Sequence, residues 1–167
     1  MNESNQSSLF RDWYRKHQGI ILRVARANTL NLSDQEDLVQ EISIQIWDSI
    51  PKFERKCKES TWIYRVALNT AITWNQKERR QRETKTALAE DLKFLIETTE
   101  PRNEKLEWIF DQIRLFNSID RSLLLLHLDG LSYLEIADII GTSEKNIGVK
   151  LSRLRKTLTQ KASNHEF

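Results

Sequence analysis

The chain has 167 residues, of which 39% are hydrophobic and 30% are charged, so it can form one domain or two small ones with modest cores. Its four Gly and two Pro offer few turns for a β-rich fold, whereas its abundant Leu, Ile, Lys, Arg, Glu and Gln favour helix. The net charge of +2 indicates no partner by itself, but basic and acidic residues alternate in blocks, which suits one surface for nucleic acid and another for a protein. We expect an all-α protein made of two small helical domains joined by a flexible linker.

The residue types that most enzymes and metal proteins need are scarce. The three His and Cys57 show no metal-ligand spacing, and no glycine-rich phosphate-binding loop occurs. We therefore expect no catalytic residue, no metal and no cofactor, and Cys57 can form no internal disulfide. The N-terminus lacks a signal-peptide layout and no apolar run reaches membrane-spanning length, which predicts a cytoplasmic protein without membrane insertion.

The first part of the chain predicts helix after a disordered start. Residues 1–8 are polar and are expected to be disordered. Apolar residues from Leu9 to Leu30 recur at helical spacing and predict one helix, or two that divide at Gly19. Ser33 and Glu36 then have the spacing of a capping box, which predicts the start of another helix.

The helix after Ser33 is amphipathic. Leu38, Ile42 and Ile46 recur every four residues on its apolar face, and Pro51 is expected to end the helix. By charge alone, its outward face reads as an ordinary solvated surface, made of Asp37, Gln40, Glu41, Gln45 and Asp48.

A basic loop, residues 52–60, leads into a long helix that completes the first domain, residues 9–83. This helix is expected to start at Ser60 or Thr61, and Trp62 and Trp74 are expected in the core. Its second half is as consistent with a solvated helix as with one that faces phosphates, and it carries Lys77, Arg79, Arg80, Arg82 and Lys85.

Residues 84–102 lack clear periodicity and predict the linker, with at most a short helix around residues 88–96. The second domain, residues 103–161, is expected to begin with a helix whose apolar positions are Leu106, Trp108, Ile109, Ile113, Leu115 and Phe116. Asp120 is expected to cap the next helix, and the four leucines at 123–126 predict its burial.

The segment from Leu128 to Leu158 has the pattern of a helix-turn-helix. Ser132 and Glu135 form a capping box, Gly141 can take the positive φ of a helix end, and Ser143 can cap a second helix. That second helix turns Ile147, Leu151, Leu154 and Leu158 inward. Its outward face predicts contact with the DNA major groove through Lys145, Asn146, Lys150, Arg153 and Arg155.

Two segments together resemble a known family. The run DLVQEISIQIWDSIPKF, followed by STWIYRVALNTAI, resembles the promoter-melting domain of a bacterial RNA polymerase sigma factor. The run DGLSYLEIADIIGTSEKNIGVKLSRLRKTL resembles the domain with which these proteins read the minus-thirty-five promoter element. Their order, and the linker between them, are similar to the extracytoplasmic-function (ECF) group over about residues 9–160.

The resemblance implies partners and roles. Core RNA polymerase would dock on the helix that carries Asp37, Gln40 and Glu41, which replaces the interpretation of a solvated face. The loop after that helix would hold a flipped base of the minus-ten element, and the long helix would support it and meet the promoter backbone. The implied minus-ten residues are Lys52, Phe53, Arg55, Lys56, Lys58, Trp62, Asn69, Lys77, Arg79, Arg80 and Arg82.

The same resemblance assigns the minus-thirty-five element to the recognition helix, through Lys145, Asn146, Lys150, Arg153 and Arg155. It also implies promoter DNA and an anti-sigma factor as partners. The sequence departs from the family pattern at Thr73 and Gln76, where Asp and Arg are common, and at Gly148, where a basic residue is common. The family's proline before a helix of the second domain is replaced by Ile119 and Asp120.

Two other functional classes compete with the sigma factor interpretation. An autonomous helix-turn-helix regulator would bind a palindromic duplex tightly as a dimer without polymerase. A nucleic-acid-modifying enzyme is disfavoured, because the sequence offers no metal site or nucleophile.

Overall fold

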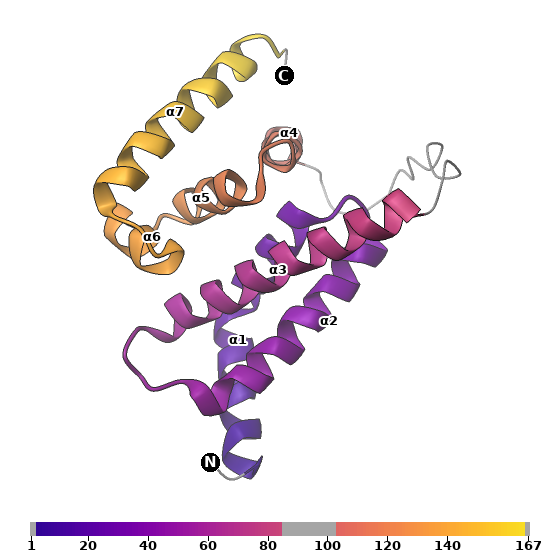
Figure 1. The fold of residues 1–167 in the computed structure, drawn as a ribbon, viewed down its shortest axis with the longest axis vertical. Coiled ribbons are helices and arrows are strands. Elements are labelled where there is room, and N and C mark those ends of the chain that lie inside the picture. Colours follow the sequence, from indigo (N-terminus) through magenta and orange to yellow (C-terminus); the bar gives the residue numbers. More distant parts are fainter. Residues whose placement is uncertain (1–2, 85–102, 166–167) are drawn as a thin grey trace. The chain divides into compact units, whose positions relative to one another are not determined.

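The computed structural model describes residues 3–84 and 103–165, which form seven α-helices and one 3-10 turn, with no β-strand in those ranges. The chain divides into two compact units, residues 1–100 and 101–167. Unit 1 contains α1 (Glu3–Asn28), α2 (Leu32–Ser49), the turn η1 (Ile50–Lys52) and α3 (Glu59–Thr84). Unit 2 contains α4 (Glu104–Arg114), α5 (Ser118–Leu128), α6 (Tyr133–Ile140) and α7 (Glu144–Ser163) (Figure 1). The all-α prediction is confirmed. None of the described helices is both long and apolar enough to cross a membrane.

Unit 1 is a three-helix arrangement in which each of α1, α2 and α3 packs against the other two. Apolar side chains at helical spacing meet in its centre, where Trp13, Ile21, Leu38, Ile42 and Ile63 are almost fully buried. A hydrogen bond joins the last residue of α1 to the interior of α3, because Asn75 Nδ2 donates to Asn28 Oδ1 at 2.9 Å. Burial of these apolar faces, rather than any single polar contact, holds the three helices together.

The start of α1 corrects the prediction of disorder for residues 3–8, while residues 1–2 lie outside the described residues. Helix α1 begins at Glu3 and runs through Gly19 without a break, so it is one helix rather than two. Its first turns have a partner on α2: Gln6 Nε2 donates to Trp47 O at 2.8 Å, and the Phe10 ring meets the Trp47 ring edge-on. These long-range contacts order a polar segment that has little helix signal of its own.

Two predicted helix caps are wrong because asparagine takes their place. Asn31, not Ser33, caps α2, and Asn117, not Asp120, caps α5. Each Asn accepts a hydrogen bond from the backbone N–H three residues on, and its amide also donates to the Asp side chain at that position, at 2.8 Å in α2 and 2.7 Å in α5. At both helix starts the Asn side chain thus caps a backbone N–H, and its own amide is held by the Asp carboxylate three residues on.

The other helix ends lie close to their predicted positions. Pro51 ends α2 as predicted, since α2 stops at Ser49 and η1 follows. Helix α3 begins at Glu59, just before the expected Ser60 or Thr61. Residues 85–102 lie outside the described residues. They include the whole predicted linker except residue 84, which ends α3, and the short helix predicted inside the linker.

Unit 2 is built around α5. The four leucines at 123–126 are between 0 and 2% exposed, which confirms their predicted burial. From α4, the predicted Ile113 is buried and so is Phe110, whereas the predicted Leu106 and Leu115 are 42% and 70% exposed, so the core face of α4 agrees only in part with the prediction. Helix α4 also ends at Arg114, before Leu115.

Arg121 joins α5 to the end of α4. Its guanidinium Nη2 donates to the backbone oxygens of Arg114 and Phe116, at 2.9 and 3.0 Å. These carbonyls lie where α4 leaves its last acceptors without helical partners. Burial, and then the charge of Arg114, lower the pKa of Arg121.

The helix-turn-helix pattern is confirmed in its details. Ser132 and Glu135 form the capping box of α6, and Gly141 ends α6 with φ of +80°. Ser143 caps α7 by accepting a hydrogen bond from the backbone N–H of Asn146. Ile147 and Leu151 are fully buried and Leu154 nearly so, which fixes the inward face of α7.

Candidate polymerase and nucleic-acid interfaces

The outward side of α2 presents acids and amides around one exposed apolar side chain. Leu38, Ile42 and Ile46 are at most 2% exposed and turn the opposite side of α2 into the core. We call the solvent side the α2 outer face and define it by Asp37, Gln40, Glu41, Ile44, Gln45 and Asp48. Glu41 Oε1 accepts a hydrogen bond from Gln45 Nε2 at 3.1 Å.

Ile44 is a member of the α2 outer face that the sequence pattern did not single out. Its side chain is 53% exposed. Three positions before and three after it, Glu41 and Trp47 are half-buried, so Ile44 stands out from its surroundings. An apolar side chain ringed by charges is typical of the centre of a protein-binding surface. The signal that could have found it is that Ile44 lies outside the four-residue repeat formed by Leu38, Ile42 and Ile46.

The basic loop between η1 and α3 is held by aromatic packing. The half-buried Phe53 ring lies 5.0 Å from the Trp13 ring and 5.6 Å from the Trp62 ring, centroid to centroid. Trp62 Nε1 donates to Ser49 Oγ at 3.0 Å, which joins the start of α3 to the end of α2. Phe53 and Trp62 therefore pack within unit 1, and the core interpretation of Trp62 gains support although its side chain keeps some exposure.

The loop turns its cations to solvent. Arg55, Lys56 and Lys58 are all exposed. Arg55 has φ of 57°, in the left-handed region that a non-glycine residue rarely adopts. Lys56 pairs with the neighbouring Glu54 carboxylate. The structure thus presents the basic side chains of this loop while its single large ring is fixed below them.

A small charged cluster lies where α1 meets the first turn of α3. Lys16 Nζ donates to Glu59 Oε2 at 3.2 Å, and His17 Nε2 lies 3.7 Å from the same oxygen. Burial and the Lys16 charge lower the pKa of His17, and these effects outweigh the opposite effect of Glu59. Burial raises the pKa of Glu59, but Lys16, Trp13 and His17 together outweigh it, so the net shift of this pKa is downward.

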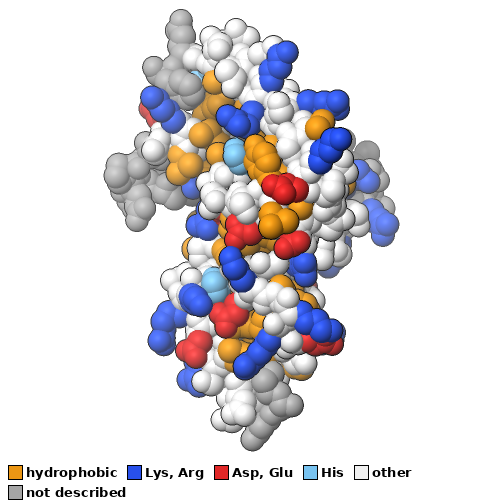
Figure 2. All heavy atoms as spheres, turned by 90° about the vertical axis from the view of Figure 1, so that its left-hand side faces the viewer, with side chains coloured by type: hydrophobic (Ala, Val, Ile, Leu, Met, Phe, Trp, Pro, Cys, Tyr) orange, Lys and Arg blue, Asp and Glu red, His pale blue; other side chains and the backbone are white. Residues whose placement is uncertain are grey.

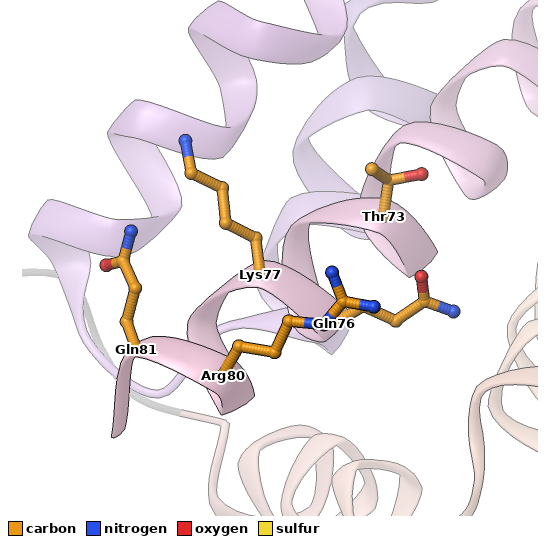
Figure 3. Close-up of a pocket in the computed structure, with 5 residues that line it drawn as sticks. All are labelled: Thr73, Gln76, Lys77, Arg80 and Gln81. Carbon is orange, nitrogen blue, oxygen red and sulfur yellow. The ribbon is translucent and has the colours of Figure 1, made fainter. Parts of the chain in front are cut away.

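The polar half of α3 carries two kinds of side chain. Asn69, Thr73, Gln76 and Arg80 are exposed at spacings of four, three and four, so they share one face of the helix. A hollow of about 250 Å³ runs along this half, lined by Thr73, Gln76, Lys77, Arg80 and Gln81. In Figure 3, Thr73, Gln76 and Arg80 extend to one side of α3, and Lys77 and Gln81 to the other. Neutral hydrogen-bonding groups thus share a face with one cation.

The structure describes the exposure of all but one of the remaining residues predicted to have a role on α3. Lys77 and Arg79 are exposed, as a phosphate-facing interpretation requires. Arg82 belongs to α3, but its side chain lies outside the described part. Trp74 is half-buried rather than fully in the core.

All five residues predicted to read DNA on α7 are exposed: Lys145, Asn146, Lys150, Arg153 and Arg155. Figure 2 shows one face of the molecule, on which Lys and Arg side chains lie around exposed hydrophobic ones. Gly148 does not face outward. A Cβ at this position would lie 3.6 Å from Tyr133 Cε2 of α6, so its lack of a side chain concerns the packing of two helices.

The described residues hold no group of three or more His, Cys, Asp or Glu side chains that could bind a metal ion. Cys57 is free and half-buried in the basic loop.

Comparison with known proteins gives one family for both units. The Sigma-70 region 2 family matches residues 13–81, and the Sigma-70 region 4 family matches residues 113–158. The ECF RNA polymerase sigma-E factor of Haemophilus influenzae is 30% identical over 158 residues, covering 87% of this chain and 81% of its own length. The chain belongs to the ECF group of RNA polymerase sigma factors.

Other relatives agree with this membership. The RNA polymerase sigma factor YlaC of Bacillus subtilis is 27% identical over 155 residues and covers 88% of each chain. The solved structure of CnrH with the cytosolic domain of CnrY has a TM-score of 0.70, at 17% identity, and covers 96% of this chain and 91% of that one. The sigma factor RpoE of Bartonella quintana, solved with the anti-sigma factor NepR, has a TM-score of 0.68 at 20% identity, covering 90% and 96%. These two likenesses concern the fold.

Family membership settles the functional class. A sigma factor directs RNA polymerase to promoters and initiates transcription, so the prediction of that function is confirmed and the autonomous regulator is not favoured. The region 2 match covers most of α1 to α3, and the region 4 match covers α5, α6 and most of α7. The α2 outer face and the basic loop lie in the first match, and the exposed face of α7 lies in the second.

Proposed function

We propose that this sigma factor binds core RNA polymerase through the α2 outer face, melts the minus-ten element with unit 1 and reads the minus-thirty-five element with α7. The observation that carries the proposal is the α2 outer face itself. Its opposite side is committed to the core, and its exposed side combines Asp37, Gln40 and Glu41 with the apolar Ile44. Such a surface suits a protein partner that is basic around an apolar centre.

The minus-ten residues divide between direct contact and support. Exposed Arg55, Lys56 and Lys58 are suited to phosphates beside a flipped base, and Asn69 can form hydrogen bonds to a base edge. Phe53 and Trp62 support the loop, since their rings pack against each other within unit 1. The remaining proposed contacts to the promoter backbone are Lys52, Lys77, Arg79, Arg80 and Arg82.

We further propose that the protein has no catalytic activity of its own and works in the cytoplasm. The polymerase would carry out all the chemistry, while this chain contributes binding free energy for the promoter and for the melted strand.

An anti-sigma factor is the remaining proposed partner. CnrH and the Bartonella quintana RpoE were both solved with protein partners, the latter with an anti-sigma factor. Such a partner is expected to cover the α2 outer face and to compete with core polymerase for it. Glu41→Lys should then weaken both associations.

The proposal is tested by binding of the purified full chain to core polymerase, followed by run-off transcription from a promoter library. We expect association and promoter-specific transcripts. Glu41→Lys should reduce the association at least tenfold, because it reverses a charge at the docking surface. Asp12→Lys is the matched control, since it reverses an exposed charge on α1 outside the α2 outer face. No polymerase association, together with tight dimeric binding to a palindromic duplex, would contradict the proposal.

A further inference from the structure

Helix α7 exposes one large hydrophobic side chain, Val149, which is 46% exposed. The buried residues Ile147, Leu151 and Leu154 define the inward side of the helix. With 100° per residue, Val149 lies almost opposite the mean direction of these three residues. It therefore occupies the centre of the outward face, where Lys145 and Arg153 lie one turn before and after it.

The rotation of α7 about its axis is fixed at this point. Gly148, the preceding residue, faces Tyr133 of α6 at ordinary contact distance. Ser143 caps the start of the helix and holds its first turn. Val149 is β-branched, so one χ1 rotamer dominates in a helix and its two methyl groups point in a constant direction.

The surroundings of Val149 offer it no apolar partner within α7. Its exposed neighbours on the outward face are Lys145, Asn146, Ser152 and Arg153. Val has a lower helix propensity than Ala or Lys, so helix stability does not account for Val at an exposed position. What remains is a fixed apolar contact surrounded by hydrogen-bonding and cationic groups.

We infer that Val149 determines specificity by contacting the C5-methyl group of a thymine in the upstream promoter element. This inference rests on the proposed function, in which α7 lies in the major groove. The thymine methyl is the apolar group that the major groove presents, and Ala, Thr methyl and Phe are known to contact it. Asn146 and Arg153, three residues before and four after Val149, would form hydrogen bonds to neighbouring base edges or phosphates.

The test uses holoenzyme made from core polymerase and the full chain. Promoter duplexes are first selected from a pool with a randomised upstream element. Each thymine of the selected element is then replaced singly by deoxyuridine, which lacks only the methyl group. We expect one replacement to weaken binding by about threefold to fivefold, the range for burial of one methyl-sized group.

Val149→Ala should weaken binding to the thymine duplex by a similar factor and should remove the difference between thymine and deoxyuridine at that position. Ala favours helix more than Val, so this variant is expected to fold, and circular dichroism checks it. Leu115→Ala, which removes an exposed apolar side chain just after the end of α4, should keep the full thymine–deoxyuridine difference.

Three results would overturn the inference. If holoenzyme selects a defined element but shows no Val149-dependent loss at any thymine, only the inference fails. Val149→Ala could instead weaken association with core polymerase in the absence of DNA, which would assign Val149 to a protein contact. Failure to bind polymerase or to select any element would remove the proposed function as well.

Discussion

Gly148 lies inside a helix, where glycine usually lowers stability because it leaves the unfolded chain more freedom. A Cβ here would lie 3.6 and 3.7 Å from two Tyr133 ring carbons, which is ordinary contact, and the backbone is not in the left-handed region. Gly148→Ala should therefore stabilise unit 2 by about 0.5–1 kcal/mol. Chemical denaturation of the full chain, followed by helical circular dichroism, measures this change.

Gly141→Ala is the matched comparison. Gly141 has φ of +80°, a conformation that alanine adopts only with strain, so this variant should lose stability although its Cβ would meet no atom within 4 Å. Equal changes in stability for Gly148→Ala and Gly141→Ala would show that the backbone conformation of the glycine does not decide the effect of substitution. Promoter binding should be unchanged by Gly148→Ala, since the position faces α6 rather than DNA.

The stability of unit 1 depends on pH through His17. Its pKa lies below the ordinary value of 6.5, chiefly because of burial and the Lys16 charge. The unfolded chain therefore takes up a proton at a higher pH than the folded chain, and stability falls as pH decreases through 6.5. The contribution is complete above about pH 7.5 and declines toward pH 5.

Hydrogen exchange of the α1 amides at pH 7.5 and 5.5, corrected for intrinsic rates, measures this decline. In the His17→Gln variant, the protection of the α1 amides should fall less between pH 7.5 and pH 5.5. The lowered pKa of Glu59 affects stability only below its ordinary value of 4.5, so the two groups act in separate pH ranges. An identical decline in wild type and His17→Gln would exclude His17 as its source.

Arg121, a residue of α5, caps the end of the neighbouring helix α4 with its side chain. Arg121→Ala would leave the Arg114 and Phe116 carbonyls without this donor, at a cost of about 1–3 kcal/mol to unit 2. The stability of Arg121→Lys should lie between those of the wild type and Arg121→Ala, because an ammonium lacks the planar fork of the guanidinium. Lys156→Ala, at an exposed position on α7, should change stability by less than about 0.5 kcal/mol. Urea denaturation of each variant compares them.

Helix ends show which local signals a sequence carries. The capping box of α6 and the glycine at its end were predictable because one side chain and one backbone conformation decide them. The starts of α2 and α5 differ from the predicted ones because Asn31 and Asn117 cap these helices and pair with the Asp three residues on. Reading Asn-x-x-Asp as a capping signal would have found both.

Long-range packing accounts for the other differences. The order of residues 3–8 depends on contacts between α1 and the end of α2, at Trp47, which no local pattern in the first eight residues encodes. Leu115 is exposed because α4 ends one residue earlier and turns it away from Phe110 and Ile113. The outward residues of α2 and α7 were predictable, since their apolar repeats alone fix which side is buried. Ile44 and Val149 belong to neither repeat, and only the polar residues of each outward face indicated a function.

For the whole molecule, polymerase binding and upstream DNA reading are assigned to different units. Glu41→Lys should lower polymerase association and leave the sequence preference of the remaining complexes unchanged. Arg153→Ala should leave association intact and weaken promoter binding, by about 1–3 kcal/mol if it contacts a base edge. In the double variant the two losses should add in free energy, because the residues share no partner. Titration with core polymerase measures the loss of association, and titration of the complex with promoter DNA measures the loss of promoter binding. A double variant no worse than either single one would show that both residues act at one step.

Each unit has its own core, and this affects the order in which the protein becomes functional during synthesis. The last residue of α7 follows the last residue of α3 by 79 positions, from 84 to 163. At the usual rate of translation this interval lasts about 4 to 16 s, far longer than a small helical domain needs to fold. We therefore expect the nascent chain to expose a completed polymerase-docking helix on the ribosome before its upstream DNA-reading helix has been made.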